Sequence, residues 1–239
     1  HYRDEGDETK PVIVLVHGSN ASLHTWEPWV EIFKADYRVI SMDLPAHGLT
    51  GATPDKDYSS QAQVNTVQAV VSHLDVDTFV LGGNSMGGGV TWRYTLQQPE
   101  KVLAMLLVDS SGLPQFRRQP VAAEGESKQS PLIFTLMSKA WFRTAARYLD
   151  PYFLAVQGLK SAYNNSPVVT DELIDRYYEL AIREGSREAT ISRFSGFGSR
   201  SREPVDVTPF NMPTLIMWGA EDALIPVSVA DQFAATLAN

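Results

Sequence analysis

The sequence contains no cysteine among its 239 residues. This absence excludes disulfide bonds, thiolate metal sites and a cysteine nucleophile. A chain without cysteine is compatible with a reducing compartment, which favours a cytoplasmic location.

Long apolar runs and an excess of basic charge are missing as well. No run of about 18 apolar residues is present, so no segment is expected to span a membrane. The net charge is −8 at pH 7, and no basic stripe is visible that would bind nucleic acid. An apolar content of 44% is enough to bury a large core, as in a globular enzyme that acts on a small molecule. The sequence does not indicate an oligomeric state.

Short apolar runs alternate with helix-like segments along most of the chain. Strands are predicted at about 12–17, 38–43, 78–83, 103–109 and 214–218. Helices are predicted at about 26–33, 59–74, 86–98 and 226–237. This alternation is typical of an α/β fold with a mainly parallel sheet flanked by helices.

The alternation stops between residues 113 and 208. Helices are predicted in this stretch near 132–148, 151–162, 171–183 and 187–194, with no convincing strand. A long helical insertion of this kind is typical of a lid over the carboxyl edge of the sheet, although ordinary crossover helices are an alternative. We therefore predict an α/β core formed by residues 1–112 and 209–239, truncated at both ends, and a helical lid formed by residues 113–208. Aromatic residues on the lid are candidates to line an apolar pocket: Trp141, Phe142, Tyr148, Tyr152, Phe153 and Tyr163.

The pentapeptide Gly83-Asn84-Ser85-Met86-Gly87 lies where a predicted strand leads into a predicted helix. It has the form G-x-S-x-G, which at such a turn is a nucleophile elbow. The serine of an elbow takes a strained backbone conformation, and the glycines leave room where side chains would collide. We predict that Ser85 is a catalytic nucleophile; an incidental serine in a glycine-rich turn is the alternative.

A carboxylate partner for the serine is expected after a later strand, because the triad order in this architecture is serine, acid, histidine. Asp222 follows the predicted strand at 214–218 and is the favoured acid, with Glu221 and Asp109 as alternatives. It would accept the Nδ1–H of a histidine and hold its tautomer.

Backbone donors for an oxyanion are expected beside the elbow. The loop that begins His17-Gly18-Ser19-Asn20 closes the first apolar strand, and Ser19 is the favoured first donor, with Asn20 as the next candidate for a donor or substrate contact. Met86, directly after the nucleophile, is the expected second donor. His17 is interpreted as structural, and so is His47.

Four stretches together resemble the α/β-hydrolase superfamily: VIVLVHGSNASLHTW, YRVISMDLPAHGLTG, FVLGGNSMGGGVTWRYTLQQPEKVLAMLLVDSSG and PTLIMWGAEDALIP. Ala46 stands where the family often has glycine. The resemblance implies a lidded serine hydrolase, similar to carboxylesterases and meta-cleavage-product hydrolases, that requires no metal and no organic cofactor. A serine at the elbow, where the epoxide hydrolases of this fold have aspartate, implies acyl transfer through an acyl-enzyme.

The leading hypothesis is therefore a carboxylesterase that acts on a small or medium acyl substrate. One alternative is a carbon–carbon bond hydrolase of the meta-cleavage-product type, in which an arginine at about the position of Arg176 would assist the carboxylate of the substrate. Another is a non-catalytic relative that uses the pocket for binding.

Histidine is scarce: the chain has five, and the last is His73, so none follows Asp222. In the architecture that the chain resembles, the catalytic histidine comes after one more strand. We therefore expect a strand, the catalytic histidine and a closing helix outside the given residues. We also expect residues before His1, which leaves an N-terminal signal or anchor open.

Overall fold

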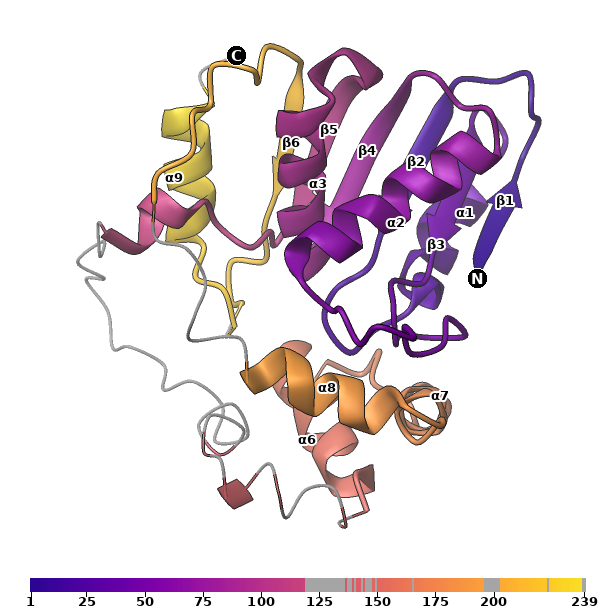
Figure 1. Ribbon diagram of the computed structural model, residues 1–239, viewed down its shortest axis with the longest axis vertical. Coiled ribbons are helices and arrows are strands. Elements are labelled where there is room, and N and C mark those ends of the chain that lie inside the picture. The colour runs from indigo at the N-terminus through magenta and orange to yellow at the C-terminus, as the bar shows by residue number, and fades with distance from the viewer. Residues whose placement is uncertain are drawn as a thin grey trace.

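The computed structural model describes residues 1–118, 150–164, 166–195, 203–222 and 224–237, together with Leu136, Lys139, Trp141, Phe142, Thr144 and Tyr148 (Figure 1). Most of the helix predicted near 132–148 lies outside the described residues.

A six-stranded sheet in the order β1-β3-β2-β4-β5-β6 forms the centre of the molecule. The strands are β1 (Tyr2–Glu5), β2 (Val12–Val16), β3 (Arg38–Met42), β4 (Phe79–Asn84), β5 (Val102–Val108) and β6 (Thr214–Met217). All neighbouring pairs are parallel except β1 and β3, which are antiparallel. The predicted α/β fold with a mainly parallel sheet is confirmed.

Helices cover both faces of the sheet because residues of each strand alternate between the faces. On β2, Val14 and Val16 face a large cluster with α2 (Ser60–His73), α3 (Met86–Gln97) and α9 (Ser228–Thr236). Residues Ile13 and Leu15 face a smaller cluster with α1 (Glu27–Phe33). Short 3₁₀ helices are η1 (Leu23–Trp26), η2 (Pro99–Lys101) and η3 (Pro114–Arg118).

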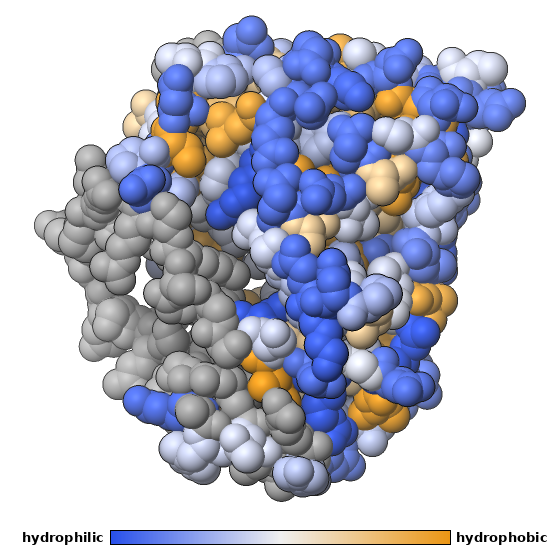
Figure 2. All heavy atoms as spheres, in the orientation of Figure 1, coloured by the Kyte–Doolittle hydropathy of each residue, from blue (hydrophilic) through white to orange (hydrophobic). Residues whose placement is uncertain are grey.

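Helix α2 shows the amphipathic pattern expected of a helix that packs on a sheet. Three of its four valines, Val64, Val67 and Val71, are buried at helical spacing. Hydrophilic residues dominate the opposite, outward surface over α2 (Figure 2). Ser59 caps the start of the helix. Its side chain accepts the Ala62 N–H, which is one of the backbone donors that have no partner within the helix.

Three further helices lie together at one end of the sheet, below it in Figure 1: α6 (Tyr152–Ala162), α7 (Asp171–Ala181) and α8 (Ser186–Ser195). We call them the helical block. Polar contacts join the block to the core, and one of them is a 3.2 Å ion pair between Lys56 and Glu188. Among the described residues, no helix has the length and apolar character needed to cross a membrane.

Two glycines allow α3 to start directly against the central strands. A β-carbon on Gly87 would lie 2.1 Å from the Val16 carbonyl oxygen, and one on Gly83 would lie 2.3 Å from the Gly87 carbonyl oxygen. Both distances are far below van der Waals contact, so any side chain at these positions would displace the helix or the strands.

We expect Gly87→Ala to lower the free energy of unfolding by ~1–3 kcal/mol, as overpacking does. This cost exceeds the ~1 kcal/mol that alanine gains over glycine inside a helix. Urea denaturation measures it, with Gly51→Ala as the control, because a β-carbon on Gly51 would meet no atom within 4 Å. Equal stabilities of the two variants would contradict the close approach.

Candidate active site

Ser85 occupies the turn between β4 and α3 with φ 52° and ψ −113°. Positive φ is uncommon for a residue with a side chain and costs ~1–3 kcal/mol unless the surroundings hold it in place. Here the Ser85 N–H donates to the Val108 carbonyl oxygen at 2.9 Å, and its own carbonyl oxygen accepts the Ser111 N–H at 2.8 Å. The strained backbone that the elbow motif predicts is therefore present and fixed by the end of β5.

A cavity of about 480 Å³ lies at the carboxyl ends of the parallel strands, against the helical block. Residues at the ends of four neighbouring strands, or within five residues after them, line its floor: Gly18, Ser19, Asn20, Asn84, Ser85, Asp109 and Asp222. The parallel topology brings these residues together, because all four strands end at the same edge of the sheet.

The helical block gives the cavity two chemically different walls. Helix α6 lines one side with small or aliphatic residues at helical spacing: Leu154, Ala155, Gly158, Leu159 and Ala162. A β-carbon on Gly158 would meet no atom within 4 Å. Helix α8 lines another side with polar residues: Ser186, Arg187, Thr190 and Arg193.

Among the aromatic residues predicted to line the pocket, Tyr163 does so, and Tyr177 joins it. Burial raises the pKa of the Tyr163 hydroxyl, and the neighbouring Tyr177 adds to the rise. Three of the others are mostly exposed, namely Trp141, Tyr148 and Phe153. Tyr152 packs edge-on against Tyr178, with 5.1 Å between the ring centres. Phe142 packs against Trp141 and is not among the described residues that line the cavity.

Asp222 and Asp109 lie on the same side of the cavity, each held by backbone N–H groups. The Asp222 Oδ1 accepts the Leu224 N–H at 2.6 Å and the Ile225 N–H at 3.0 Å. The Asp109 Oδ1 accepts the Gly219 N–H at 2.8 Å. Burial raises the pKa of the Asp109 carboxyl, and the charge of Asp222 raises it further.

Glu221, the alternative to Asp222 as the acid, contacts a residue of the helical segment instead. Its Oε2 accepts the Asn164 side-chain N–H at 2.5 Å, and it is not among the described residues that line the cavity. The structure therefore brings Asp222 and Asp109 together with Ser85 and places Glu221 outside.

The loop of residues 18–21 runs beside the elbow, and we call it the oxyanion loop. A β-carbon on Gly18 would lie 3.3 Å from the Ser85 Cβ and 2.8 Å from the Asn84 Oδ1. Its close approach explains why glycine stands there.

The His17 ring sets the direction of the peptide group that joins Gly18 to Ser19. Its Nε2 accepts the Leu44 N–H at 3.0 Å, so its Nδ1 carries the proton and donates to the Gly18 carbonyl oxygen at 2.7 Å. In a trans peptide the N–H points opposite to the C=O, so the Ser19 N–H points away from His17. Ser19 lines the cavity, which fits the donor role predicted for it.

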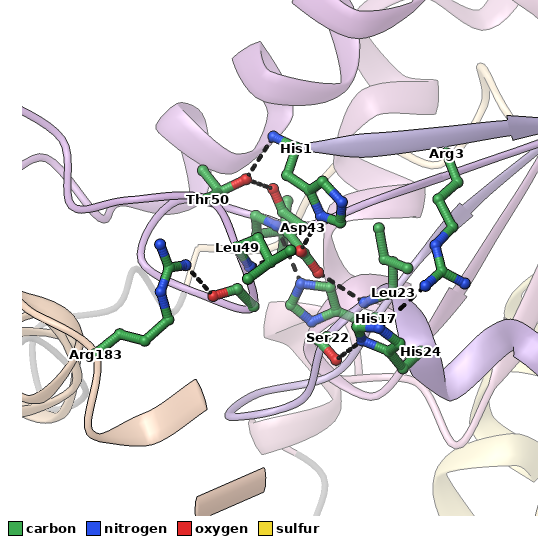
Figure 3. Close-up of polar contacts among 12 residues, drawn as sticks. His1, Arg3, His17, Ser22, Leu23, His24, Asp43, Leu49, Thr50 and Arg183 are labelled. Carbon is green, nitrogen blue, oxygen red and sulfur yellow. Dashed lines mark hydrogen bonds and ion pairs between the residues drawn. The ribbon is translucent and has the colours of Figure 1, made fainter. Parts of the chain in front are cut away.

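The carboxylate of Asp43 joins two loops beside the cavity (Figure 3). It accepts the Leu23 N–H at 2.7 Å and the Leu49 N–H at 2.8 Å, and it contacts the His1 ring at 2.6 Å. Gly48 has φ 50°, and a β-carbon there would lie 2.2 Å from this carboxylate. These contacts hold the loop that carries His47 against the core.

His47 is buried with its ring centre 4.9 Å from that of His17. Its Nδ1 donates to the Pro45 carbonyl oxygen at 3.0 Å, and its Nε2 contacts the Arg193 guanidinium. Burial holds the pKa of the His47 ring well below its usual value, and Arg193 lowers it further. Both histidines bond to backbone groups, as expected of structural residues.

Arg176, the predicted carboxylate contact, lies on α7 and pairs with Glu27 of α1 at 2.9 Å. It is not among the described residues that line the cavity. The arginines that do line it are Arg187 and Arg193, which the sequence analysis did not single out. The sequence pattern that could have identified them is their spacing: Arg187, Thr190 and Arg193 are three residues apart, which places them on one face of a helix.

The described residues contain no group of three or more histidine, aspartate or glutamate side chains that could hold a metal ion.

A family model described as alpha/beta hydrolase fold matches residues 11–239. The chain is 27% identical over 239 residues to the uncharacterized hydrolase YugF of Bacillus subtilis, covering 100% of this chain and 82% of that protein. It is 28% identical over 247 residues to a 2-hydroxy-6-oxononadienedioate/2-hydroxy-6-oxononatrienedioate hydrolase of Escherichia coli, covering 95% and 76%. The crystal structure of the meta-cleavage product hydrolase CumD of Pseudomonas fluorescens superimposes with a TM-score of 0.77 at 24% identity, covering 98% and 81%. These matches confirm the predicted α/β-hydrolase fold.

The buried histidines predict a pH dependence of stability. Burial lowers the pKa of His17 to about 4, so the folded chain keeps this ring neutral while the unfolded chain protonates it below about 6.5. The free energy of unfolding should therefore be highest above pH 6.5 and fall as the pH drops from 6.5 toward 4, by ~1.4 kcal/mol per pH unit for each such histidine. Urea denaturation between pH 7 and 5 measures the slope. His17→Gln should reduce the slope by ~1.4 kcal/mol per pH unit, which corresponds to one proton taken up on unfolding. An unchanged slope would show that His17 does not titrate on unfolding.

Proposed function

The chain is a hydrolase of the alpha/beta hydrolase fold family, and from that premise we propose that it is a serine hydrolase that cleaves carboxylic esters. The observation that carries the proposal is Ser85, at positive φ between β4 and α3, on the floor of a cavity shared with Asp222. A strained serine at the start of a helix, open to a cavity, is the arrangement of an activated nucleophile.

In the proposed reaction, the Ser85 hydroxyl adds to the ester carbonyl carbon while its proton passes to a base. The alcohol leaves with that proton, and the acyl group stays on the Ser85 Oγ. Water, deprotonated by the same base, then hydrolyses the acyl-enzyme and releases the carboxylic acid.

Two backbone N–H groups stabilise the oxyanion in this proposal, those of Ser19 and Met86. Met86 is the first residue of α3, and the first N–H groups of a helix have no partner within it. The positive end of the helix dipole favours the developing negative charge. The Ser19 N–H points away from His17, on a loop that lines the cavity.

We propose that Asp222 orients a histidine that lies outside the given residues. Each of the five histidines in the given residues contacts a group other than Asp222. His1 contacts Asp43, His17 contacts Gly18, His24 contacts Ser22 and Arg3, His47 contacts Pro45 and Arg193, and His73 packs against the ring of Tyr2. Asp222 is favoured over Asp109 because it stands past the end of β6, where the triad acid is expected.

The helical block acts as a lid in this proposal, and α6 binds the acyl chain. A cavity of about 480 Å³ with an aliphatic wall suits a small or medium acyl group. The Arg183 guanidinium contacts the Gly48 carbonyl oxygen at 2.6 Å, and this contact and the ion pair of Lys56 and Glu188 are two of the contacts between the lid and the core.

Carbon–carbon bond hydrolysis is the second candidate. The relative from Escherichia coli that is named as a dienedioate hydrolase favours it, as do two cationic side chains in the cavity lining, Arg187 and Arg193. Arg176 does not support it, because its guanidinium pairs with Glu27 outside the lining.

Ser85→Ala should abolish hydrolysis of short p-nitrophenyl esters by the full-length protein, because it removes the hydroxyl that forms the acyl-enzyme in the proposed reaction. Loss of the triad serine costs ~10⁶ in kcat in comparable enzymes. A fluorophosphonate should label the wild type once, at Ser85, and leave the variant unlabelled by mass spectrometry. Undiminished turnover in the variant would contradict the covalent mechanism, and an inactive, unlabelled wild type would favour a binding protein.

A side-by-side assay of aryl esters and a 2-hydroxy-6-oxo-dienoate separates the two candidates. If the dienoate is the substrate, Arg187→Ala should lower kcat/KM by ~10–100-fold through loss of a charge-assisted hydrogen bond. The matched control Arg176→Ala should change either activity by less than about threefold, since it removes an exposed ion pair. Ester turnover that is insensitive to both changes, with no dienoate cleavage, would eliminate the carbon–carbon candidate.

A further inference from the structure

We propose that Arg193 is a positioning residue that makes the oxyanion loop depend on closure of helix α8 over the cavity. This inference rests on the proposed function, because it concerns the Ser19 N–H as an oxyanion donor. It assigns a role in catalysis to a side chain of the lid that does not itself touch the reacting atoms.

The core holds the chain at Gly18 through His17 and, just past the oxyanion loop, at Leu23 through Asp43. Between these two points, Ser19 and Asn20 are exposed. His17 holds the Gly18 carbonyl oxygen, and the Ala21 N–H closes a turn onto the same oxygen at 3.4 Å. Beyond this point the chain enters the left-handed region at Asn20, with φ 58°. Asparagine tolerates this conformation better than most residues, but it remains less favourable than an extended backbone.

Arg193 of helix α8 contacts this exposed segment at Asn20. Its Nη2 donates to the Asn20 Oδ1 at 2.9 Å and to the Thr190 Oγ1 at 3.0 Å. The Thr190 contact lies within α8 and orients the guanidinium, and the Asn20 contact joins α8 to the residue after Ser19. The direction of the Ser19 N–H is therefore restrained by His17 before it and by Arg193, through Asn20, after it.

His47 gives the guanidinium its second core partner. The Nδ1–H of His47 donates to the Pro45 carbonyl oxygen, so the Nε2 of His47 is an acceptor. It accepts an Nη1–H of Arg193. One planar side chain from the lid thus bridges two loops, those that follow β2 and β3. Such a fork-shaped donor holds two acceptors at fixed angles, which an ammonium group cannot do.

The consequence is a coupling between lid closure and catalysis. When α8 moves away from the core, Asn20 loses the Arg193 contact and the Ser19 N–H loses its fixed direction. Oxyanion stabilisation depends on donors that are already oriented, and removal of one donor costs ~10²–10³ in kcat. A loosened donor should cost part of that amount.

Arg183 provides a matched control. It is also an arginine that reaches from the helical block to a core loop, where it donates to the Gly48 carbonyl oxygen (Figure 3). Its core contact is in the loop after β3, and it is not among the described residues that line the cavity.

The test measures kcat and KM of the full-length protein with p-nitrophenyl butyrate, and the affinity for an alkyl trifluoromethyl ketone, which forms a tetrahedral oxyanion adduct on the serine. Arg193→Met should lower kcat by ~10–100-fold with KM changed by less than about threefold, and the ketone should bind weaker by a similar factor. Arg193→Lys should recover part of the loss, and Arg183→Met should leave kcat within about threefold of the wild type.

Asn20→Ala tests the same contact from the exposed side of the loop, where loss of the fold is not expected. It should lower kcat with KM nearly unchanged, as Arg193→Met does, and the double variant should be no worse than Arg193→Met alone, because that substitution already removes the contact with Asn20. Equal kcat values for Arg193→Met and Arg183→Met, or a rise in KM with kcat unchanged, would show that Arg193 only latches the lid and would overturn the proposal. An active wild type with these results would leave the esterase proposal intact, whereas an inactive wild type would overturn both.

Discussion

Helix α3 begins almost in contact with the two central strands, and this close approach is the constraint on which the site depends. Gly83 and Gly87 have no space for a β-carbon, so the backbone between them must turn within a few residues. Ser85 sits at the middle of that turn and takes a positive φ as a result. Hydrogen bonds to Val108 and Ser111 hold it there, so the strain is offset by the neighbouring strand.

Loops without regular secondary structure form the same edge of the sheet. Hydrogen bonds to buried polar side chains hold these loops in place. Asp43 binds two backbone N–H groups from separate loops, and His17 binds one N–H and one carbonyl oxygen. Buried groups of this kind cost free energy unless all their partners are present. The floor of the cavity is therefore as specific a structure as the sheet, although it is made of loops.

The parts that the sequence predicts well depend on local signals. Apolar runs marked the five parallel strands, and G-x-S-x-G at a strand–helix boundary marked Ser85. The strand at Tyr2–Glu5, which pairs with β3, contains no apolar run and is not among the strands predicted from such runs. The site residues that come from strand ends follow from the parallel topology once the strands are known.

The parts that it predicts poorly depend on contacts between distant segments. Packing decides whether an arginine of the helical block faces the cavity or a carboxylate of another helix, and Arg176 pairs with Glu27. Arg193 meets partners more than a hundred residues away, at Asn20 and His47, which no spacing rule connects. Aromatic residues were a weak guide to the cavity because most aromatic side chains on helices pack or stay exposed for other reasons.

The wall formed by α6 has a consequence for how such an enzyme diversifies. Gly158 faces open space, and its neighbours on the wall are small or aliphatic, so a larger residue there would shorten the chain that the cavity accepts. A substitution of this kind would alter neither the central sheet nor the turn that carries Ser85. New substrate preferences can therefore arise by mutation of the helical block alone, while the stability of the core and the catalytic chemistry are inherited unchanged.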